Sequence, residues 1–297
     1  MDEALARTAE DAIPKLTFNH SAGQASRVDV VRLSTLRGRQ LDHSIFSPTR
    51  LEFHLVHFIT EGRGVHFVDF ERIPLRAGDV LHIRPEQVHS FDRESRHRAS
   101  LLMFTPGTLE RAHIPQPVRW QAGVVISPAT ADFRMLTDLL RLQESLDASS
   151  ADIRPETVGP HLLATVLAGL ADVVAARHRG IDPTAQRYEN LVLDFESLLD
   201  QHHSEVRSAS WYATRLGTTP RTLARACHQV RESSPKRLID LRVILEAKRQ
   251  LATSPATVEA TGYALGFSEP TNFVKFFKRL VGSTPDAFRR SQVPGSA

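Results

Sequence analysis

The chain has 297 residues, of which 41% are hydrophobic and 24% charged, so it is long enough for about two globular domains with cores of their own. It contains no run of 18 apolar residues and no charged-then-apolar leader, and we therefore expect a cytoplasmic protein rather than a membrane-spanning or secreted one. Its single cysteine, Cys227, excludes an intrachain disulfide and is expected to be a small buried apolar residue rather than a redox sensor.

Charge is unevenly distributed along the chain. Residues 204–297 hold 15 Lys and Arg against 7 Asp and Glu, a net charge of +8, whereas residues 1–203 hold 22 against 27, a net charge of −5. A basic C-terminal third attached to a mildly acidic remainder is typical of a polyanion-binding domain joined to a second domain. A solvated basic surface without a partner would give the same counts, so charge alone does not decide between the two interpretations.

The first part of the chain predicts β structure. Residues 1–24 are expected to form an N-terminal arm, because they are polar and alanine-rich with no strong periodicity. Short β-rich runs separated by glycine and proline then follow at residues 28–33, 51–59, 65–70, 75–85, 88–91 and 101–104. The turn at residues 61–64 has the length of a hairpin connection, and the whole pattern favours a sandwich or barrel.

The middle of the chain predicts two helices, at residues 132–146 and 155–177. The second carries an apolar stripe at helical spacing, which would pack it on its own domain: Leu162, Leu163, Val166, Leu167, Leu170 and Val174. Residues 179–187 include Gly180 and Pro183 and are expected to link two domains. A third amphipathic helix at 188–202 would open a C-terminal domain that extends to residue 291.

The C-terminal domain contains one pattern twice. Each copy reads as a helix, a turn glycine and a second helix, with a small residue four positions before the glycine: Ala213 before Gly217, and Gly262 before Gly266. Two helices that cross steeply through a short turn need a small side chain at the crossing and a residue tolerant of positive φ at the corner. The pattern therefore predicts two helix-turn-helix units.

Each second helix also has a recognisable beginning. Thr219-Pro220 starts the first, and Ser268-Glu269-Pro270 starts the second, so a hydroxyl would cap free N–H groups and proline would occupy the first turn. Between the units, residues 235–253 read as one helix, which at ~1.5 Å per residue would be a rod of roughly 28 Å. With the width of the flanking units added, the two second helices would lie about 34 Å apart, which is one turn of B-DNA.

The last third of the chain resembles the C-terminal signature of AraC/XylS-type transcription regulators. The resemblance lies in ATGYALGFSEPTNF at residues 260–273, FFKR at 276–279 and GSTPDAFR at 282–289. Thr261 and Gly262 depart from the isoleucine-like residue and the alanine that are usual at these places. A mid-helix glycine costs ~1 kcal/mol relative to alanine, so the second unit is expected to be looser than usual.

The resemblance also implies the residues that contact DNA, because a helix-turn-helix reads bases from the N-terminal half of its second helix. The positions that match the base-reading ones are Arg221, Ala224, Arg225, Thr271, Asn272 and Lys275. Residues better assigned to phosphates are Thr219, Arg249, Lys278 and Arg279. Leu223, Ala226 and Cys227 would face the core in the first unit, and Phe273, Phe276 and Phe277 in the second.

The β-rich part more weakly resembles the cupin-like sensor domain that often precedes this DNA-binding module. The matching residues are AGD at 77–79, RP at 84–85 and HSF at 89–91. A small-molecule effector pocket inside the barrel would then draw on Phe53, Leu55, His57, His66, Ile83 and Met103. We expect no metal or other cofactor, because His54 and His57 are spaced to lie on opposite faces of a strand and only His89 resembles a cupin ligand.

Together these features predict an α+β protein with a cupin-like β-barrel and flanking helices at residues 25–178 and an all-α domain of two helix-turn-helix units at 188–291. The resemblance implies a transcription regulator, more often an activator, that binds double-stranded DNA, a small-molecule effector and RNA polymerase. It also implies a homodimer paired through the helix at 155–177, whose apolar stripe would then form the dimer interface: Leu162, Leu163, Val166, Leu167, Leu170 and Val174. The alternatives are a regulator without a ligand, and a metal-dependent cupin enzyme with a DNA-binding tail that uses His54, His57 and His89.

Overall fold

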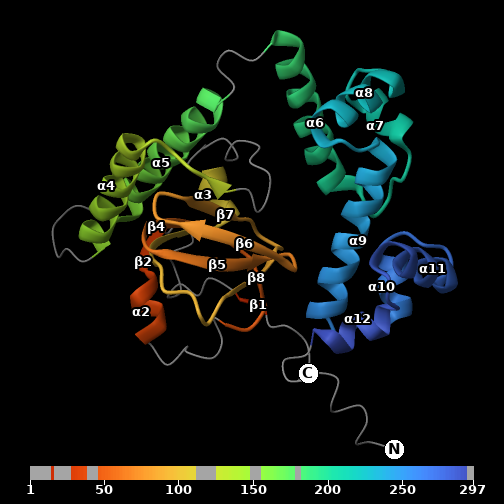
Figure 1. Ribbon diagram of the computed structural model, residues 1–297, viewed down its shortest axis with the longest axis horizontal. Coiled ribbons are helices and arrows are strands. Elements are labelled where there is room, and N and C mark those ends of the chain that lie inside the picture. The colour runs from red at the N-terminus through yellow and green to blue at the C-terminus, as the bar shows by residue number, and fades with distance from the viewer. Residues whose placement is uncertain are drawn as a thin grey trace, which may run out of the picture. The chain divides into compact units, whose positions relative to one another are not determined.

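The chain folds into two compact units, here called the N-terminal and C-terminal domains (Figure 1). The computed structural model describes residues 15–16, 28–38, 46–111, 125–147, 155–177 and 182–292. The N-terminal domain lies within residues 14–179, and the C-terminal domain contains residues 180–297. Most of the arm predicted at residues 1–24 lies outside the described residues, but Lys15–Leu16 forms a short strand, β1, parallel to β3.

The described part of the N-terminal domain contains two five-stranded sheets rather than the predicted closed barrel. In order, the first sheet consists of β1, β3 (Thr49–Leu51), β8 (Val88–Phe91), β5 (Arg63–Val68) and β6 (Glu71–Arg76). The second consists of β10 (Val125–Ile126), β7 (Val80–Ile83), β4 (His54–Glu61), β9 (Arg98–Phe104) and β2 (Val28–Arg32). The two strand orders share no strand, so the sheets form the layers of a sandwich.

The predicted hairpin across residues 61–64 is wrong. β4 pairs with β7 and β9 in the second sheet, whereas β5 pairs with β6 and β8 in the first. Gly62, at φ +77°, turns the chain out of one sheet and into the other, and Gly78, at φ +92°, does the same between β6 and β7. A hairpin and a connection between two sheets can have turns of the same length, so the spacing in the sequence does not distinguish them.

The second sheet has a core on each of its faces. Along β4, Leu55 and Ile59 point into a cluster between the two sheets, and Val56 and Phe58 point into a cluster beneath the helices. The helices α4 (Thr130–Asp147) and α5 (Pro155–Arg177) cover that outer face. Two shorter helices, α2 (Leu33–Gly38) and α3 (Pro106–Arg111), complete the described part of the domain.

Most of the apolar stripe on α5 packs inside its own domain, so those residues do not form the dimer interface that the resemblance implied. Leu163, Val166, Leu167 and Leu170 are buried with α4 and the second sheet. Residues 157–176 of α5 are also long and apolar enough to cross a membrane by length and composition, with a mean hydropathy of 1.6, but only 28% of that window is buried. Because α5 packs along a sheet on one side, we take it as a domain helix whose apolar character extends beyond the packed face.

The described part of the C-terminal domain is entirely helical (Figure 1). Its helices are α6 (Pro183–His202), α7 (Ala209–Arg215), α8 (Pro220–Arg231), α9 (Pro235–Thr253), α10 (Val258–Ala264), α11 (Pro270–Val281) and α12 (Pro285–Ser291). α9 has the 19 residues predicted for the connecting rod. α6 begins within the predicted linker, because Asp182 accepts hydrogen bonds from the backbone N–H groups of Thr184 and Ala185 and Pro183 occupies the first turn.

Candidate DNA-binding interface

The first helix-turn-helix unit consists of α7, a turn and α8. Gly217 holds the turn at φ +62°, and the backbone N–H of Thr222 donates to the Thr219 hydroxyl at 3.1 Å, which confirms the predicted cap. Tyr212 and Ala213 of α7 are fully buried against α8, and the edge of the Tyr212 ring contacts Phe195 of α6 at a centroid distance of 5.3 Å. The small residue predicted at the helix crossing is therefore in place.

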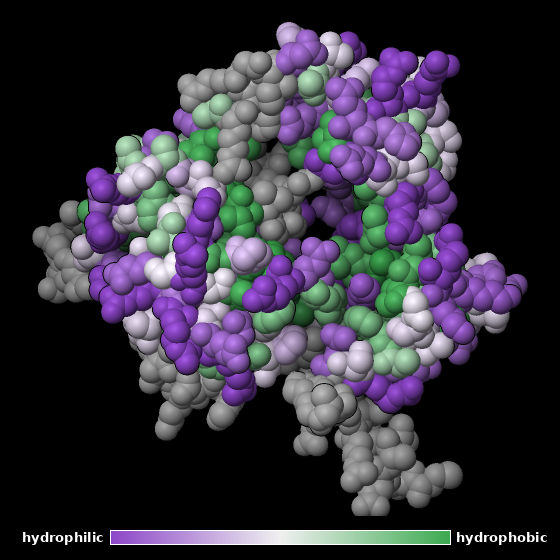
Figure 2. Space-filling model, in the orientation of Figure 1, coloured by the Kyte–Doolittle hydropathy of each residue, from purple (hydrophilic) through white to green (hydrophobic). Residues whose placement is uncertain are grey.

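α8 has one buried and one open face. Leu223, Ala226 and Cys227 are fully buried, as predicted. Arg221 and Arg225 are exposed, with Ala224 half-buried on the same side. Side chains over α8 and α11 are mostly hydrophilic (Figure 2). Arg221 and Arg225 are thus exposed to solvent on a helix whose opposite face is packed in the core.

The second unit, formed by α10 and α11, differs at the start of its second helix. Glu269 is the N-cap of α11 and makes no side-chain cap hydrogen bond, so the predicted hydroxyl cap from Ser268 is wrong. The predicted helix crossing is confirmed, because Gly262 is buried and a Cβ placed there would come within 3.1 Å of Phe273 Cβ. Gly266 forms the corner at φ +80°.

α11 has the same two-faced arrangement as α8. Phe273 and Phe277 are fully buried, and Phe276 is half-buried. The predicted contact residues lie on the open face, where they are exposed: Thr271, Asn272, Lys275, Lys278 and Arg279. Arg279 remains 64% exposed although its guanidinium lies 3.7 Å from the carboxylate of Asp240 on α9.

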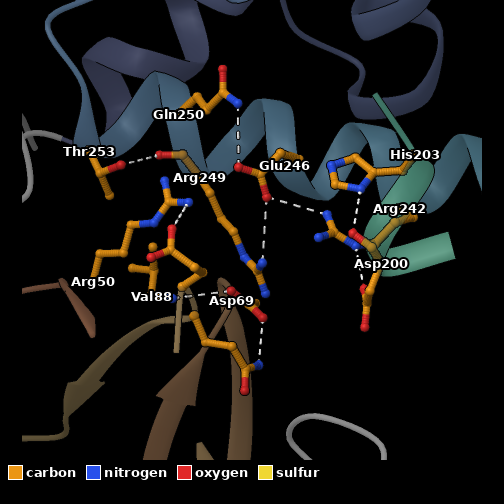
Figure 3. A network of polar contacts seen from close by, with 12 residues as sticks. Arg50, Asp69, Val88, Asp200, His203, Arg242, Glu246, Arg249, Gln250 and Thr253 are labelled. Carbon is orange, nitrogen blue, oxygen red and sulfur yellow. Dashed lines mark hydrogen bonds and ion pairs between the residues drawn. The ribbon is translucent and has the colours of Figure 1, made fainter. Parts of the chain in front are cut away.

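Arg249 differs from the other residues predicted to contact phosphates. It lies on α9, and its guanidinium forms an ion pair with Glu246 at 3.6 Å (Figure 3). Glu246 also accepts from Arg242 at 3.3 Å, and Arg242 donates to Asp200 of α6 at 2.6 Å. This chain of alternating charges ties α6 to α9, so Arg249 belongs to the internal framework and not to the exposed surface of α8 and α11.

Cys227 lies in the core of the first unit, as predicted. It is fully buried, and burial, with a smaller contribution from Glu196, raises the pKa of its thiol to about 12. A thiol with so high a pKa is protonated at neutral pH and therefore a poor nucleophile.

In the N-terminal domain the residues predicted to line a pocket gather in the space between the sheets. Phe53, Leu55 and Ile83 belong to the inter-sheet cluster, and Met103 packs against it. His57 and His66 are fully buried there with ring centroids 4.6 Å apart, and His66 Nε2 lies 3.1 Å from His89 Nδ1. Neither ring nitrogen of His57 has a hydrogen-bond partner among the described residues.

The three histidines His57, His66 and His89 are held in the neutral form. Burial lowers the pKa of His57 and His66 well below its usual value and lowers that of His89 to about 4. A neutral imidazole offers one hydrogen-bond donor and one acceptor. The core between the sheets therefore combines apolar side chains with uncharged polar groups.

The three histidines required for the alternative metal-dependent enzyme do not come together. His54 stacks on Phe104 of the outer-face cluster, whereas His57 lies between the sheets, so the two occupy opposite faces of β4 as predicted. In the described ranges there is no group of three or more His, Cys, Asp or Glu side chains that could hold a metal ion.

One contact between the two helix-turn-helix units was not predicted. Arg207, just before α7, donates from Nη2 to the backbone carbonyl of Leu265 in the turn of the second unit at 2.6 Å. The sequence pattern around Arg207 shows no motif, and only its place immediately before the N-cap of α7, Ser208, marks it.

A basic helical domain with two exposed recognition helices, joined to a sheet domain with a partly polar interior, defines a ligand-linked DNA-binding regulator. Two family models match the chain: the AraC-like ligand binding domain at residues 32–163 and a helix-turn-helix domain at residues 212–291. The chain belongs to the AraC family of transcription regulators.

Curated relatives extend over most of the chain. The HTH-type transcriptional activator RhaS of Escherichia fergusonii is 22% identical over 259 residues, covering 85% of this chain and 91% of the relative. RhaS of Yersinia pseudotuberculosis is 24% identical over 263 residues, covering 83% and 90%.

Solved structures show a looser similarity. Fatty acid-bound ToxT from Vibrio cholerae covers 92% of this chain and 94% of its own, with a TM-score of 0.42 and 11% identity. The DNA-binding domain of AdpA in complex with a target DNA covers 37% and 97%, with a TM-score of 0.32 and 26% identity. With scores this low, the family assignment rests on the sequence matches.

Proposed function

We propose that α8 and α11 read two successive major-groove segments of one operator, which makes the protein a sequence-specific activator of transcription. The observation that carries this proposal is the matched orientation of residues on both helices. In each helix the polar residues expected to read bases are open to solvent, while the opposite face is buried in the core of the same domain. Base edges are reached from the N-terminal half of such a helix, which is where these residues lie.

The chemistry of the exposed residues suggests what each helix would read. Arg221 or Arg225 would donate two hydrogen bonds to guanine O6 and N7, and Asn272 would pair with adenine. Thr271, Lys275 and Ala224 would complete the base-reading surface. Thr219, Lys278 and Arg279 would hold phosphates, which fixes the register of the protein without reading sequence.

Selection of duplexes from a random-sequence library by the full-length protein tests this function. We expect an enriched operator with two conserved segments whose centres lie about 10 base pairs apart. We also expect the selected duplex to bind at least about 1000-fold more tightly than a scrambled one at physiological salt. Equal binding of both duplexes would refute a sequence-specific function.

We propose that the effector binds between the two sheets of the N-terminal domain. The support is the buried His57, which stacks on Phe91 and packs edge-to-face with His66, and whose ring nitrogens have no hydrogen-bond partner among the described residues. Unpaired polar groups in an apolar interior carry a desolvation cost that a bound hydroxyl or carboxyl group would relieve. A small molecule that carries such groups is therefore the expected effector class.

The effector site is tested with His57→Phe, which keeps a ring to stack on Phe91 but removes both nitrogens. A panel of polyhydroxylated and carboxylated metabolites is screened for thermal stabilisation of the full-length protein. We expect at least one compound to raise the melting temperature of the wild type and not that of the variant. A compound that stabilises both proteins equally would place the effector elsewhere.

We propose that the protein dimerises through the outer sides of α4 and α5. α5 is apolar on more than its packed face, and α4 exposes Met135 and Leu142, which are 56% and 48% exposed and two helical turns apart. Exposed large apolar side chains in one region mark interaction surfaces. Met135→Glu should convert a dimer to a monomer in sedimentation experiments, whereas Arg134→Glu, a change of charge at the neighbouring position, should not.

We propose that the protein acts in the cytoplasm and recruits RNA polymerase to its promoters. The relatives named transcriptional activators support the direction of regulation. Transcription in vitro from a template that carries the selected operator upstream of a promoter should rise on addition of the protein. A fall in transcript would identify a repressor instead.

A further inference from the structure

The two helix-turn-helix units touch each other directly as well as through α9. The segment between α6 and α7, residues 203–208, belongs to the first unit, and the turn at residues 265–267 belongs to the second. Arg207 crosses between them: its Nη2 donates to Leu265 O at 2.6 Å, and its guanidinium lies over the ring of Phe267 at 4.5 Å from the centroid. A hydrogen bond and a cation–π contact thus come from one side chain.

The backbone on either side of Arg207 is anchored in the first unit. The hydroxyl of Tyr212, whose ring is fully buried, donates to Val206 O at 3.1 Å. On the other side, the Ser208 hydroxyl accepts from the backbone N–H of Trp211 and caps α7. Arg207 therefore extends from a fixed point on the first unit.

The other end of the contact leads to the second recognition helix. The Phe267 ring packs against Phe273 and Phe276 of α11, with centroids 5.3 and 5.2 Å apart. The Arg207 guanidinium is itself 5.6 Å from the centroid of Phe276. A displacement of Arg207 would consequently reach α11 through at most one intervening ring.

The backbones of the two units also meet next to this side chain. A Cβ placed on Gly266 would overlap the carbonyl oxygen of Ser204, so only glycine permits this approach. The negative charge of Asp240 on α9 acts favourably on the Arg207 guanidinium, and the same carboxylate lies 3.7 Å from Arg279 of α11. Burial lowers the pKa of Arg207, but an arginine stays charged, and these contacts offset part of its lost hydration.

We propose that Arg207 is a positioning residue that sets the spacing and angle between α8 and α11, and through them the spacing that the protein accepts between its two operator segments. The proposal rests on the proposed reading of DNA by both helices. Long helices such as α9 curve, so a rod alone leaves the two units some freedom to rock. The direct contact removes that freedom by joining the units at a second point.

Operator spacing provides the first test. One inserted base pair rotates the second segment by about 34° and moves it about 3.4 Å along the axis. For the wild type we expect each base pair inserted between the segments of the selected duplex to weaken binding about 10-fold. For Arg207→Met, which keeps the apolar stem and loses the guanidinium, we expect weaker binding at the native spacing and a penalty of only about 2-fold to 3-fold per inserted base pair.

The matched control is Arg215→Met. Arg215 is exposed, stacks over Trp211 at 5.4 Å and lies within the first unit. It should keep the wild-type spacing penalty. Arg207→Lys retains the charge but not the flat guanidinium, so it should fall between the wild type and Arg207→Met.

A second test needs no DNA. Gln229→Cys on α8 and Lys278→Cys on α11 place labelling sites at exposed positions, whereas the buried Cys227 should stay unlabelled. Pulsed electron resonance on spin-labelled full-length protein should give a narrow distance distribution in the Arg207 background and a distribution about twice as broad in the Arg207→Met background.

The outcomes separate the two proposals. Failure of the wild type to select any operator would refute the proposed function, and the label distances would still decide the positioning role. An Arg207→Met protein with unchanged label distances, or one that loses the same factor of affinity at every spacing, would overturn the positioning role and leave sequence-specific binding intact.

Discussion

The two helix-turn-helix units are copies of one motif, but they are stabilised differently. Both recognition helices have 12 residues and begin with proline. The first is capped by the Thr219 hydroxyl, and a Cβ on its turn residue Gly217 would meet nothing within 4 Å. The second has no side-chain cap, and its turn residue Gly266 lies against Ser204 of the first unit. The first unit is therefore held by its own local interactions, and the second relies partly on its contact with the first.

The difference shows how one motif can tolerate unequal local sequences inside one domain. Loss of a hydroxyl cap costs a helix about 1 kcal/mol. The second unit has no such cap. Contacts with the first unit stabilise it instead, and the same contacts orient α11. Substitutions at matching positions of the two units test this asymmetry.

Substitution of the two turn glycines should give unequal losses. Both have positive φ, which costs an alanine about 1–2 kcal/mol, so Gly217→Ala should lower the free energy of local unfolding by that amount. Gly266→Ala adds the overlap with Ser204 O and should cost at least about 1 kcal/mol more. Hydrogen exchange at the amides of α8 and α11 in the full chain measures each loss. Equal losses would mean that the contact between the units contributes nothing.

Removal of one base-reading side chain from each unit should relax specificity at different operator segments. Arg225→Ala and Asn272→Ala should each lose about 1–3 kcal/mol of discrimination at the base they contact. Binding competition against single-base variants of the selected operator locates each effect. If both variants lost affinity equally for selected and scrambled duplexes, the proposal that each unit reads bases in its own operator segment would be contradicted.

Removal of the cap residues should affect only the first unit. Thr219→Ala should destabilise α8 by about 1 kcal/mol, because Thr222 N–H loses its acceptor. Glu269→Ala should leave α11 within about 0.5 kcal/mol of the wild type, because its side chain makes no cap hydrogen bond. Hydrogen exchange without DNA gives both values. A larger loss for Glu269→Ala would show that the second helix has a local cap after all.

Removal of a phosphate contact should have the smallest effect and no sequence dependence. Lys278→Ala should weaken binding to every duplex alike and reduce the slope of log K against log salt by about one. Arg249→Gln is the control, because Arg249 pairs with Glu246 and should leave that slope unchanged. A reduced slope for Arg249→Gln would return this residue to the DNA-contacting set.

Local patterns predicted the C-terminal domain well because its determinants are local. Thr219-Pro220 gave the start of α8, and the periodicity of residues 235–253 gave the bounds of α9. The exposed and buried faces of α8 and α11 follow from the 3.6-residue repeat of the helix once its start is known. The cap at Ser268 was wrong, because Glu269 occupies the N-cap position, and α6 begins at Pro183, inside the predicted linker.

Interactions between distant residues were not predictable in the same way. The assignment of β4 and β5 to different sheets depends on which strands pair, and spacing around Gly62 contains no such information. The contact of Arg242 with Asp200 spans 42 residues, and the contact of Arg207 with Leu265 spans 58 residues. A single sequence shows the chemical type of each side chain, but it does not show which distant residue folding brings into contact with that side chain.

Hydroxyl-radical footprinting of the full-length protein on its selected duplex tests the central claim most directly. If α8 and α11 read successive major grooves, the footprint will show two protected segments on one face of the duplex, with centres about 10 base pairs apart. A single protected segment, or two on opposite faces, would contradict the account.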